Sequence, residues 1–86
     1  MDKSEFRRKI ALIEPIAQKY NWIYLNNDLQ TFRVSYTDEL AIWRIDIYLS
    51  KMTVCLIPKG SKPMYYKRTD LEHLEKIFKN PYKYET

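Results

Sequence analysis

The chain has 86 residues with a formal net charge of +4, and 45% of its residues are hydrophobic. This balance is typical of one folded domain, which we expect to span residues 1–86, rather than of a disordered chain. The single glycine, cysteine and histidine exclude a glycine-rich phosphate loop, an internal disulfide and a zinc site built from several cysteines. Because the chain starts with charged residues and has no apolar run near the roughly 18 residues of a membrane span, we expect an intracellular protein without a membrane partner.

Residues 2–20 are predicted to form a helix. Its apolar residues recur at steps of three and four, which places them on one helix face: Phe6, Ile10, Ile13, Ala17 and Tyr20. Asp2 and Glu5 have the spacing of an N-terminal capping box. Pro15 removes one backbone hydrogen bond, so we expect the helix to kink or split at this residue.

Short β-prone segments follow the helix, at residues 22–25, 31–36, 41–49, 52–57 and 64–67. The third segment is the strongest, because apolar and polar residues alternate along all of it. Residues 26–28, Asn-Asn-Asp, are typical of a turn.

The alternation also predicts how the third and fourth strands pair. If Ile47 faces Val54 and Ile45 faces Leu56, the apolar side chains of both strands share one face, which a slip of one residue would destroy. Residues 50–51 contain neither the glycine nor the asparagine that two-residue turns favour, so a longer loop is an alternative.

A second helix is predicted near the C-terminus. Thr69 and Glu72 have capping-box spacing, and residues 80–81, Asn-Pro, end the helix. Its buried face should consist of Leu71, Leu74 and Phe78, flanked by Ile77. The expected fold class is α+β: a single antiparallel sheet of three to five strands, flanked by an N-terminal and a C-terminal helix packed on one face.

The sequence offers little for catalysis. His73 lies off the apolar face of the second helix, and we expect it to be solvated. Cys55 lies in the middle of a strand, far from the cations or helix ends that activate a thiolate. The acidic residues are scattered and form no metal-binding pattern. We therefore expect no enzymatic activity, cofactor or metal.

The positive charge is concentrated near the C-terminus. Residues 58–84 hold seven basic and three acidic side chains, with tyrosines between them. Cations contact phosphates and aromatic faces stack on unpaired bases, so this mixture predicts binding of RNA or single-stranded DNA. The candidate residues are Lys59, Lys62, Tyr65, Tyr66, Lys67 and Arg68. Only one of the two adjacent tyrosines should face outward, and the alternative is a solvated loop whose tyrosines pack under the sheet edge.

The uncovered face of the sheet is a second candidate surface. If Tyr36 pairs with Ala41, Arg33 lies directly across from Arg44. Two like charges side by side destabilise a sheet unless an acid or a ligand neutralises them. Asp46, two residues beyond Arg44, would be a structural partner, whereas an anionic ligand at Arg33 and Arg44 would be a functional one.

The order helix, strands, helix, together with the basic excess, resembles the double-stranded-RNA-binding domain over the whole chain. That family has a lysine cluster at the start of its second helix that grips phosphates. The matching turn here, residues 69–72, is acidic, and only Lys67 and Arg68 precede it. The resemblance therefore concerns topology.

Residues 47–81 resemble a group of small uncharacterised proteins, some of them viral. The resemblance rests on residues 47–54, Pro58-Lys59, Tyr66-Lys67-Arg68, residues 74–78 and Asn80-Pro81. This chain differs at residues 50–51, where that group has Thr-Gly, and after Pro81, where that group has His-Thr-Gly. The resemblance implies a viral or phage accessory protein and no particular activity.

We therefore predict a small non-enzymatic binding module that contacts RNA or single-stranded DNA through its basic and aromatic surface. The alternative is a protein-binding accessory factor, such as a viral or phage inhibitor of a host nuclease or defence complex, acting through a strand edge or an aromatic patch. Both are compatible with a homodimer formed through a sheet edge, and with the cytoplasm or host cytoplasm as the site of action.

Overall fold

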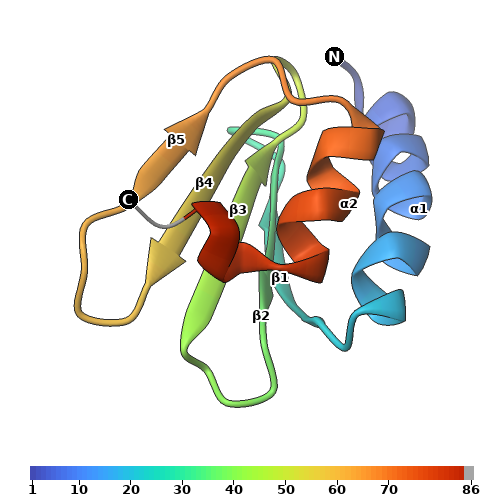
Figure 1. Cartoon of the computed structure of the whole chain (residues 1–86). Coiled ribbons are helices and arrows are strands. Elements are labelled where there is room, and N and C mark those ends of the chain that lie inside the picture. Colours follow the sequence, from blue (N-terminus) through green and yellow to red (C-terminus); the bar gives the residue numbers. More distant parts are fainter. Residues whose placement is uncertain (85–86) are drawn as a thin grey trace.

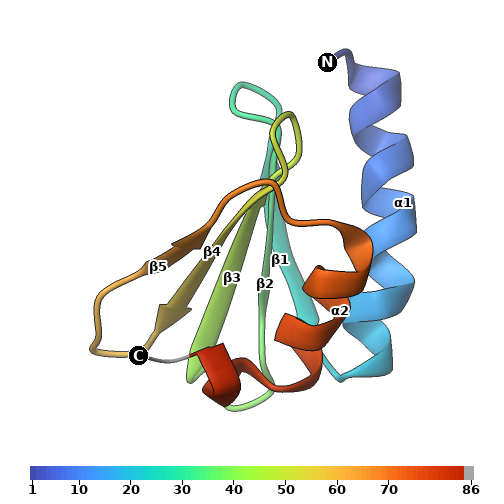
Figure 2. The same ribbon diagram turned by 45° about the horizontal axis from the view of Figure 1, so that its top comes forward.

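Five antiparallel strands form one sheet in the computed structural model, which describes residues 1–84 (Figure 1). In chain order and in spatial order they are β1 (Ile23–Asp28), β2 (Arg33–Thr37), β3 (Trp43–Tyr48), β4 (Thr53–Pro58) and β5 (Met64–Tyr66). Helices α1 (Lys3–Lys19) and α2 (Leu71–Lys79) lie on the same side of the sheet (Figure 2), and the short 3-10 helix η1 (Pro81–Tyr84) follows α2. The α+β fold expected from the sequence is confirmed. Neither helix in this part of the chain has the length and apolar character needed to cross a bilayer.

The core lies between the sheet and the two helices. Alternate residues of the three central strands are fully buried against the helices: Val34, Tyr36, Ile45, Ile47, Val54 and Leu56. The helices contribute Phe6, Ile13, Ala17, Leu74, Ile77 and Phe78. Trp43 is 3% exposed, and its ring packs edge-on against Tyr82 at 5.2 Å.

The predicted pairing of β3 with β4 is confirmed. Ile47 faces Val54 and Ile45 faces Leu56, and the two strands are joined by a loop at residues 49–52. Met52, the last residue of this loop, adopts a left-handed φ of 50°. The sequence alternative of a loop longer than residues 50–51 is therefore correct.

The predicted pairing of β2 with β3 is wrong by four residues. Tyr36 faces Ile45 instead of Ala41, so that Arg33 faces Tyr48 and not Arg44. The cause lies in the loop before β3, where the Asp38 carboxylate accepts hydrogen bonds from the backbone N–H groups of residues 42 and 43. This closed loop delays the start of β3 until residue 43.

Three local predictions about the helices need correction. α1 is not split at Pro15, which lies inside one helix, and both Pro15 and Ala11, whose carbonyl loses its N–H donor, are exposed. α2 is capped by Asp70, which accepts from the backbone N–H of His73 at 2.7 Å, while the Thr69 hydroxyl donates to the Tyr66 carbonyl. Leu71 is 38% exposed and therefore lies outside the buried face of α2.

β1 also differs from expectation. Residues 26–28 belong to the strand, and the turn lies at residues 29–32. The pairing of β1 with β2 shifts between Tyr24 and Asn26, which marks a bulge at Leu25. This edge strand is exposed along most of its length, and bulges of this kind hinder pairing with another chain.

The burial of Trp43 predicts a large loss of stability on truncation. Trp43→Ala should lower the free energy of unfolding by about 3–5 kcal/mol, because the substitution leaves a cavity between β3 and η1. Urea denaturation followed by far-UV circular dichroism measures the change. Leu40→Ala is the control, since Leu40 is 77% exposed and its loss should change stability by less than about 0.5 kcal/mol. Equal midpoints for the two variants would contradict the packing described here.

Tyr36 predicts a loss of stability in alkali. Burial, together with the hydrogen bond that its hydroxyl donates to Glu14 at 2.7 Å, raises the pKa of Tyr36 far above the ordinary value of 10.0. Above about pH 10 the unfolded chain ionises this tyrosine while the folded chain does not, so stability is complete below that pH and falls above it.

Urea denaturation at about pH 9 and about pH 11 tests this dependence. The fall approaches about 1.4 kcal/mol per pH unit for one such group. Tyr36→Phe should be less stable at the lower pH by about 1 kcal/mol, through loss of the hydrogen bond, yet decline less as the pH rises. The same decline in both proteins would show that Tyr36 is not the group responsible.

Candidate nucleic-acid interface

The face of the sheet opposite the helices is open, and it carries two tyrosines. Tyr48 of β3 faces Thr53 of β4, and Tyr65 of β5 faces Cys55 of β4. Tyr65 is 63% exposed, whereas Tyr66 is half-buried on the helix face and its ring lies 6.2 Å from that of His73. The prediction that only one of the adjacent tyrosines faces outward is confirmed, and the outward one is Tyr65.

Tyr65 lies directly opposite Cys55 in the pairing of β4 with β5. The Cys55 thiol is buried, and desolvation raises its pKa. The hydrogen bond between the two side chains raises the pKa of the Tyr65 hydroxyl. Burial thus favours the neutral thiol form of Cys55.

An ionic network built on Asp46 occupies the middle of this open face. A single carboxylate oxygen, Oδ1 of Asp46, accepts from the Ser35 hydroxyl at 2.7 Å and from Arg44 Nε at 2.9 Å. Arg33 Nη1 lies 3.9 Å from the same oxygen, and it donates to Ser35 Oγ and to the Asn26 side-chain oxygen. Asp46 therefore supplies the structural partner that the sequence suggested for the two arginines.

The two arginines are unequally available to a ligand. The side chain of Arg33 is 17% exposed and that of Arg44 is 43% exposed. The side chain of Arg33 is therefore largely buried in the network, whereas part of the Arg44 side chain is exposed and can contact a ligand.

Three cations gather around a hollow at one end of the open face. The hollow has a volume of about 520 Å³ and is lined by Lys51, Thr53, Lys67 and Arg68. Within the described chain, residues 1–84, no acidic side chain contributes to this lining. We call these four residues the basic hollow.

A long-range hydrogen bond brings the walls of the basic hollow together. The backbone N–H of Thr69 donates to the carbonyl of Met52 at 2.9 Å, which ties the segment after β5 to the β3–β4 loop. Both segments lie at the top of the sheet in Figure 1. Arg68 adopts a left-handed φ of 54°, a conformation that is uncommon for a large side chain.

The remaining predicted cations, Lys59 and Lys62, lie in the β4–β5 loop, at the opposite end of β5 (lower left in Figure 1). Lys59 there lines a second hollow of about 370 Å³, whose other lining residues include Leu25, Arg44 and Ile57. The predicted basic cluster is thus divided into two groups, with Tyr65 on the strand between them.

Sequence reasoning missed Lys51, Thr53 and Tyr48 as members of this surface. The β3–β4 register predicted from the sequence places Tyr48 opposite Thr53 on the open face, so these two residues could have been identified. Lys51 could not, because its proximity to Arg68 depends on the bond between Thr69 and Met52.

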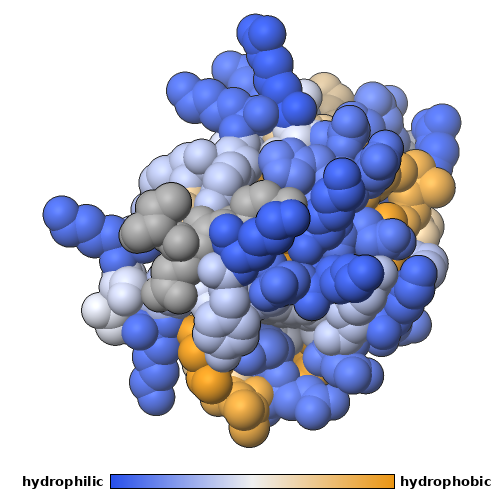
Figure 3. Space-filling view, in the orientation of Figure 1, coloured by the Kyte–Doolittle hydropathy of each residue, from blue (hydrophilic) through white to orange (hydrophobic). Residues whose placement is uncertain are grey.

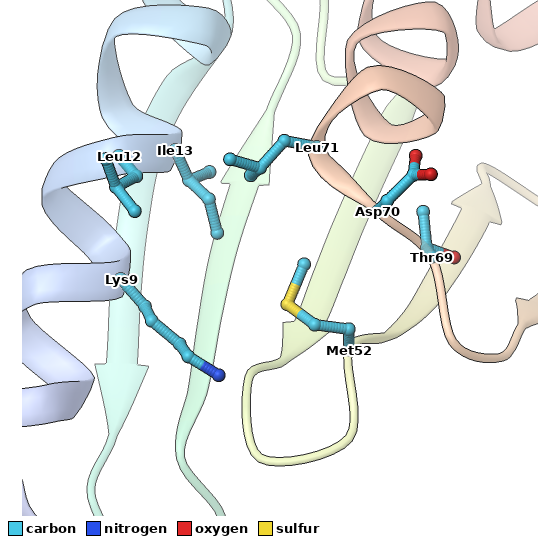
Figure 4. Close-up of a pocket in the computed structure, with 7 residues that line it drawn as sticks. All are labelled: Lys9, Leu12, Ile13, Met52, Thr69, Asp70 and Leu71. Carbon is cyan, nitrogen blue, oxygen red and sulfur yellow. The ribbon is translucent and has the colours of Figure 1, made fainter.

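An apolar groove lies between α1, the start of α2 and the β3–β4 loop. Figure 4 shows Leu12 and Ile13 of α1 facing Leu71 at the start of α2, with Met52 below them and Lys9, Thr69 and Asp70 at the rim. The groove has a volume of about 280 Å³, and Leu12 is 55% exposed. In Figure 3 an apolar patch lies over α1 and another over the β2–β3 loop, amid largely hydrophilic surroundings.

Groups suited to acid–base or metal chemistry are dispersed. His73, expected to be solvated, is half-buried beside Tyr66. Among residues 1–84, no three His, Cys, Asp or Glu side chains gather closely enough to hold a metal ion.

Comparisons of the chain with protein-family models, curated proteins and solved structures found no match. The two resemblances noted in the sequence therefore stay predictions.

The Asp46 network predicts a specific loss of stability. Asp46→Ala removes the acceptor of Ser35 and Arg44 and leaves Arg33 half-buried without its carboxylate, so the free energy of unfolding should fall by about 1–3 kcal/mol. Chemical denaturation measures the loss. Glu39→Ala removes an equal charge from an exposed loop position and should have little effect. Equal stability of the two variants would show that the network contributes nothing.

Proposed function

We propose that the protein binds RNA or single-stranded DNA across the open face of its sheet. The observation that carries the proposal is the exposed ring of Tyr65, which stands between the basic hollow and the cations of the β4–β5 loop. Phosphates carry the charge that such cations attract, and unpaired bases provide the faces that stack on aromatic rings.

The proposed path of the strand runs along β5. Phosphates contact Lys67, Arg68 and Lys51 at one end and Lys59 and Lys62 at the other, while a base stacks on Tyr65. Tyr48 lies on the same face as Tyr65 and offers a second ring. Antiparallel sheets that bind single-stranded RNA use exposed aromatic residues in this manner.

Arg33, Arg44 and Tyr66 have smaller parts in this proposal. Asp46 neutralises much of the charge of the two arginines, so that Arg44 adds a contact only through its exposed edge. Tyr66 packs against the core and supports the fold. These assignments separate binding residues from structural ones that lie next to them in the sequence.

Salt dependence tests the phosphate contacts. The logarithm of affinity for a mixed-sequence oligonucleotide should fall with the logarithm of salt concentration, with a slope of about −0.7 per contacted phosphate and near −3.5 for five contacts. Replacing Lys51, Lys67 and Arg68 with Gln should flatten the slope by about 2, and replacing Lys59 and Lys62 by about 1.4. Fluorescence anisotropy titrations at several salt concentrations measure these slopes.

The control for charge is the double variant Lys76→Gln and Lys79→Gln. Both residues are exposed on α2, on the other side of the sheet, so their loss should leave the slope unchanged. Absence of binding at low salt would refute the proposed function, as would equal effects of the control and the interface variants.

The two adjacent tyrosines provide a second test. Tyr65→Ala should weaken binding by about 1–3 kcal/mol through loss of stacking, with the salt slope unchanged and the fold intact. Tyr66→Ala should instead reduce stability, because Tyr66 packs against the core. Anisotropy and thermal denaturation of both variants measure these effects. Equal losses of affinity in two folded variants would contradict the assignment of Tyr65 as the stacking residue.

A protein-binding accessory role is the second candidate, and the apolar groove of Figure 4 favours it. Its exposed leucines, Leu12 and Leu71, are typical of surfaces that contact another protein. Affinity for such a partner should change little with salt and should fall in Leu12→Ser, a variant that leaves the basic hollow intact. Affinity for a nucleic acid should instead fall steeply with salt and should be unchanged in Leu12→Ser.

A further inference from the structure

The basic hollow brings three cations to the lining of one concave space. Lys59 and Lys62 are exposed residues of a loop, whereas Lys51, Lys67 and Arg68 line one hollow together with the Thr53 side chain. Its volume of about 520 Å³ lies within the range of small-ligand pockets, roughly 300–1,000 Å³. The three cations of this hollow can therefore contact one ligand group, whereas the hollow beside the β4–β5 loop is lined by two, Lys59 and Arg44, of which Arg44 is paired with Asp46.

On a strand with hydroxyl ends the three cations of the hollow must contact separate phosphodiesters, because one phosphodiester neutralises only one of them. Each internal phosphate of a nucleic acid carries one negative charge, but a terminal phosphate carries about −1.5 to −2 near neutral pH. Among residues 1–84, the lining of the hollow contains three cations and no carboxylate. The nearest acid in sequence, Asp70, caps α2 and lines the apolar groove instead of the hollow.

The two segments that line the hollow are joined to each other and to the core. The bond from Thr69 N–H to the Met52 carbonyl joins them, and Met52 packs against the core. Arg68 adopts a left-handed backbone, a conformation that residues with a Cβ adopt less readily than glycine.

We propose that the basic hollow is a subsite for the terminal phosphate of a nucleic-acid strand, with Lys51, Lys67 and Arg68 as ion-pair donors and the Thr53 hydroxyl as a hydrogen-bond donor. The inference rests on the proposed function, because the rest of the strand occupies the open face. It adds to that function a preference for strand ends that carry a phosphomonoester.

Oligonucleotides of one mixed sequence, with an internal fluorophore, test the inference. Three of them have the same length and differ only at their ends: one has a 5′-phosphate, one has a 3′-phosphate, and one has hydroxyls at both ends. The fourth also has hydroxyls at both ends but is one nucleotide longer, which adds an internal phosphate. One of the two phosphorylated forms should bind roughly tenfold more tightly than the hydroxyl form. The longer oligonucleotide should gain much less.

Arg68→Gly is the informative variant, because it removes the cation and also relieves the left-handed backbone. It should melt at or above the temperature of the wild type and lose most of the preference for the phosphorylated end. Ala41→Gly makes the same backbone exchange at an exposed position with φ of 55°, in a loop without the hollow, and should keep the full preference. Lys51→Gln should reduce the preference without the backbone change.

The outcomes separate the two proposals. If all four oligonucleotides bind with similar affinity, or if both phosphorylated ends gain equally, the subsite is refuted while nucleic-acid binding stands. A preference that survives in Arg68→Gly and Lys51→Gln also refutes it. If no oligonucleotide binds at low salt, the proposed function fails and the subsite fails with it.

Discussion

The whole structure depends on the fact that both helices cover the same face of the sheet. Each strand must then bury one set of alternate side chains and expose the other, so that the two faces acquire different chemistry. The covered face holds the aliphatic and aromatic core, and the open face holds hydroxyls, charges and two tyrosines. A surface available for ligands thus follows directly from where α1 and α2 pack.

The open face contains a charge that the fold itself must satisfy. Asp46 is 8% exposed, and a carboxylate buried to this degree is tolerated only with strong hydrogen-bond partners. Ser35 and the two arginines provide these partners. Asp46 offsets one of the two arginine charges at the centre of the face. The cations at the two ends of β5, where the proposed ligand makes its phosphate contacts, are not part of this network.

Alternation along the strands predicted the faces correctly but could not distinguish registers that differ by an even number of residues. The predicted β2–β3 register was displaced by four, so Val34 and Tyr36 stayed on the covered face while their partners changed. The Asp38 carboxylate decides the register, through side-chain bonds that no periodic pattern reveals. The same limit applies to the candidate site, where Lys51 meets Arg68 only through a contact between distant segments.

The chain has one glycine, yet several residues in its described part have left-handed backbones, at Asn21, Phe32, Ala41, Met52 and Arg68. A chain with so little glycine has fewer conformations to lose on folding, and this offsets part of the local strain. It also has few of the flexible glycine positions about which loops can change conformation. Binding at the open face should therefore resemble the docking of a rigid template, on which the incoming strand, rather than the protein, loses conformational freedom.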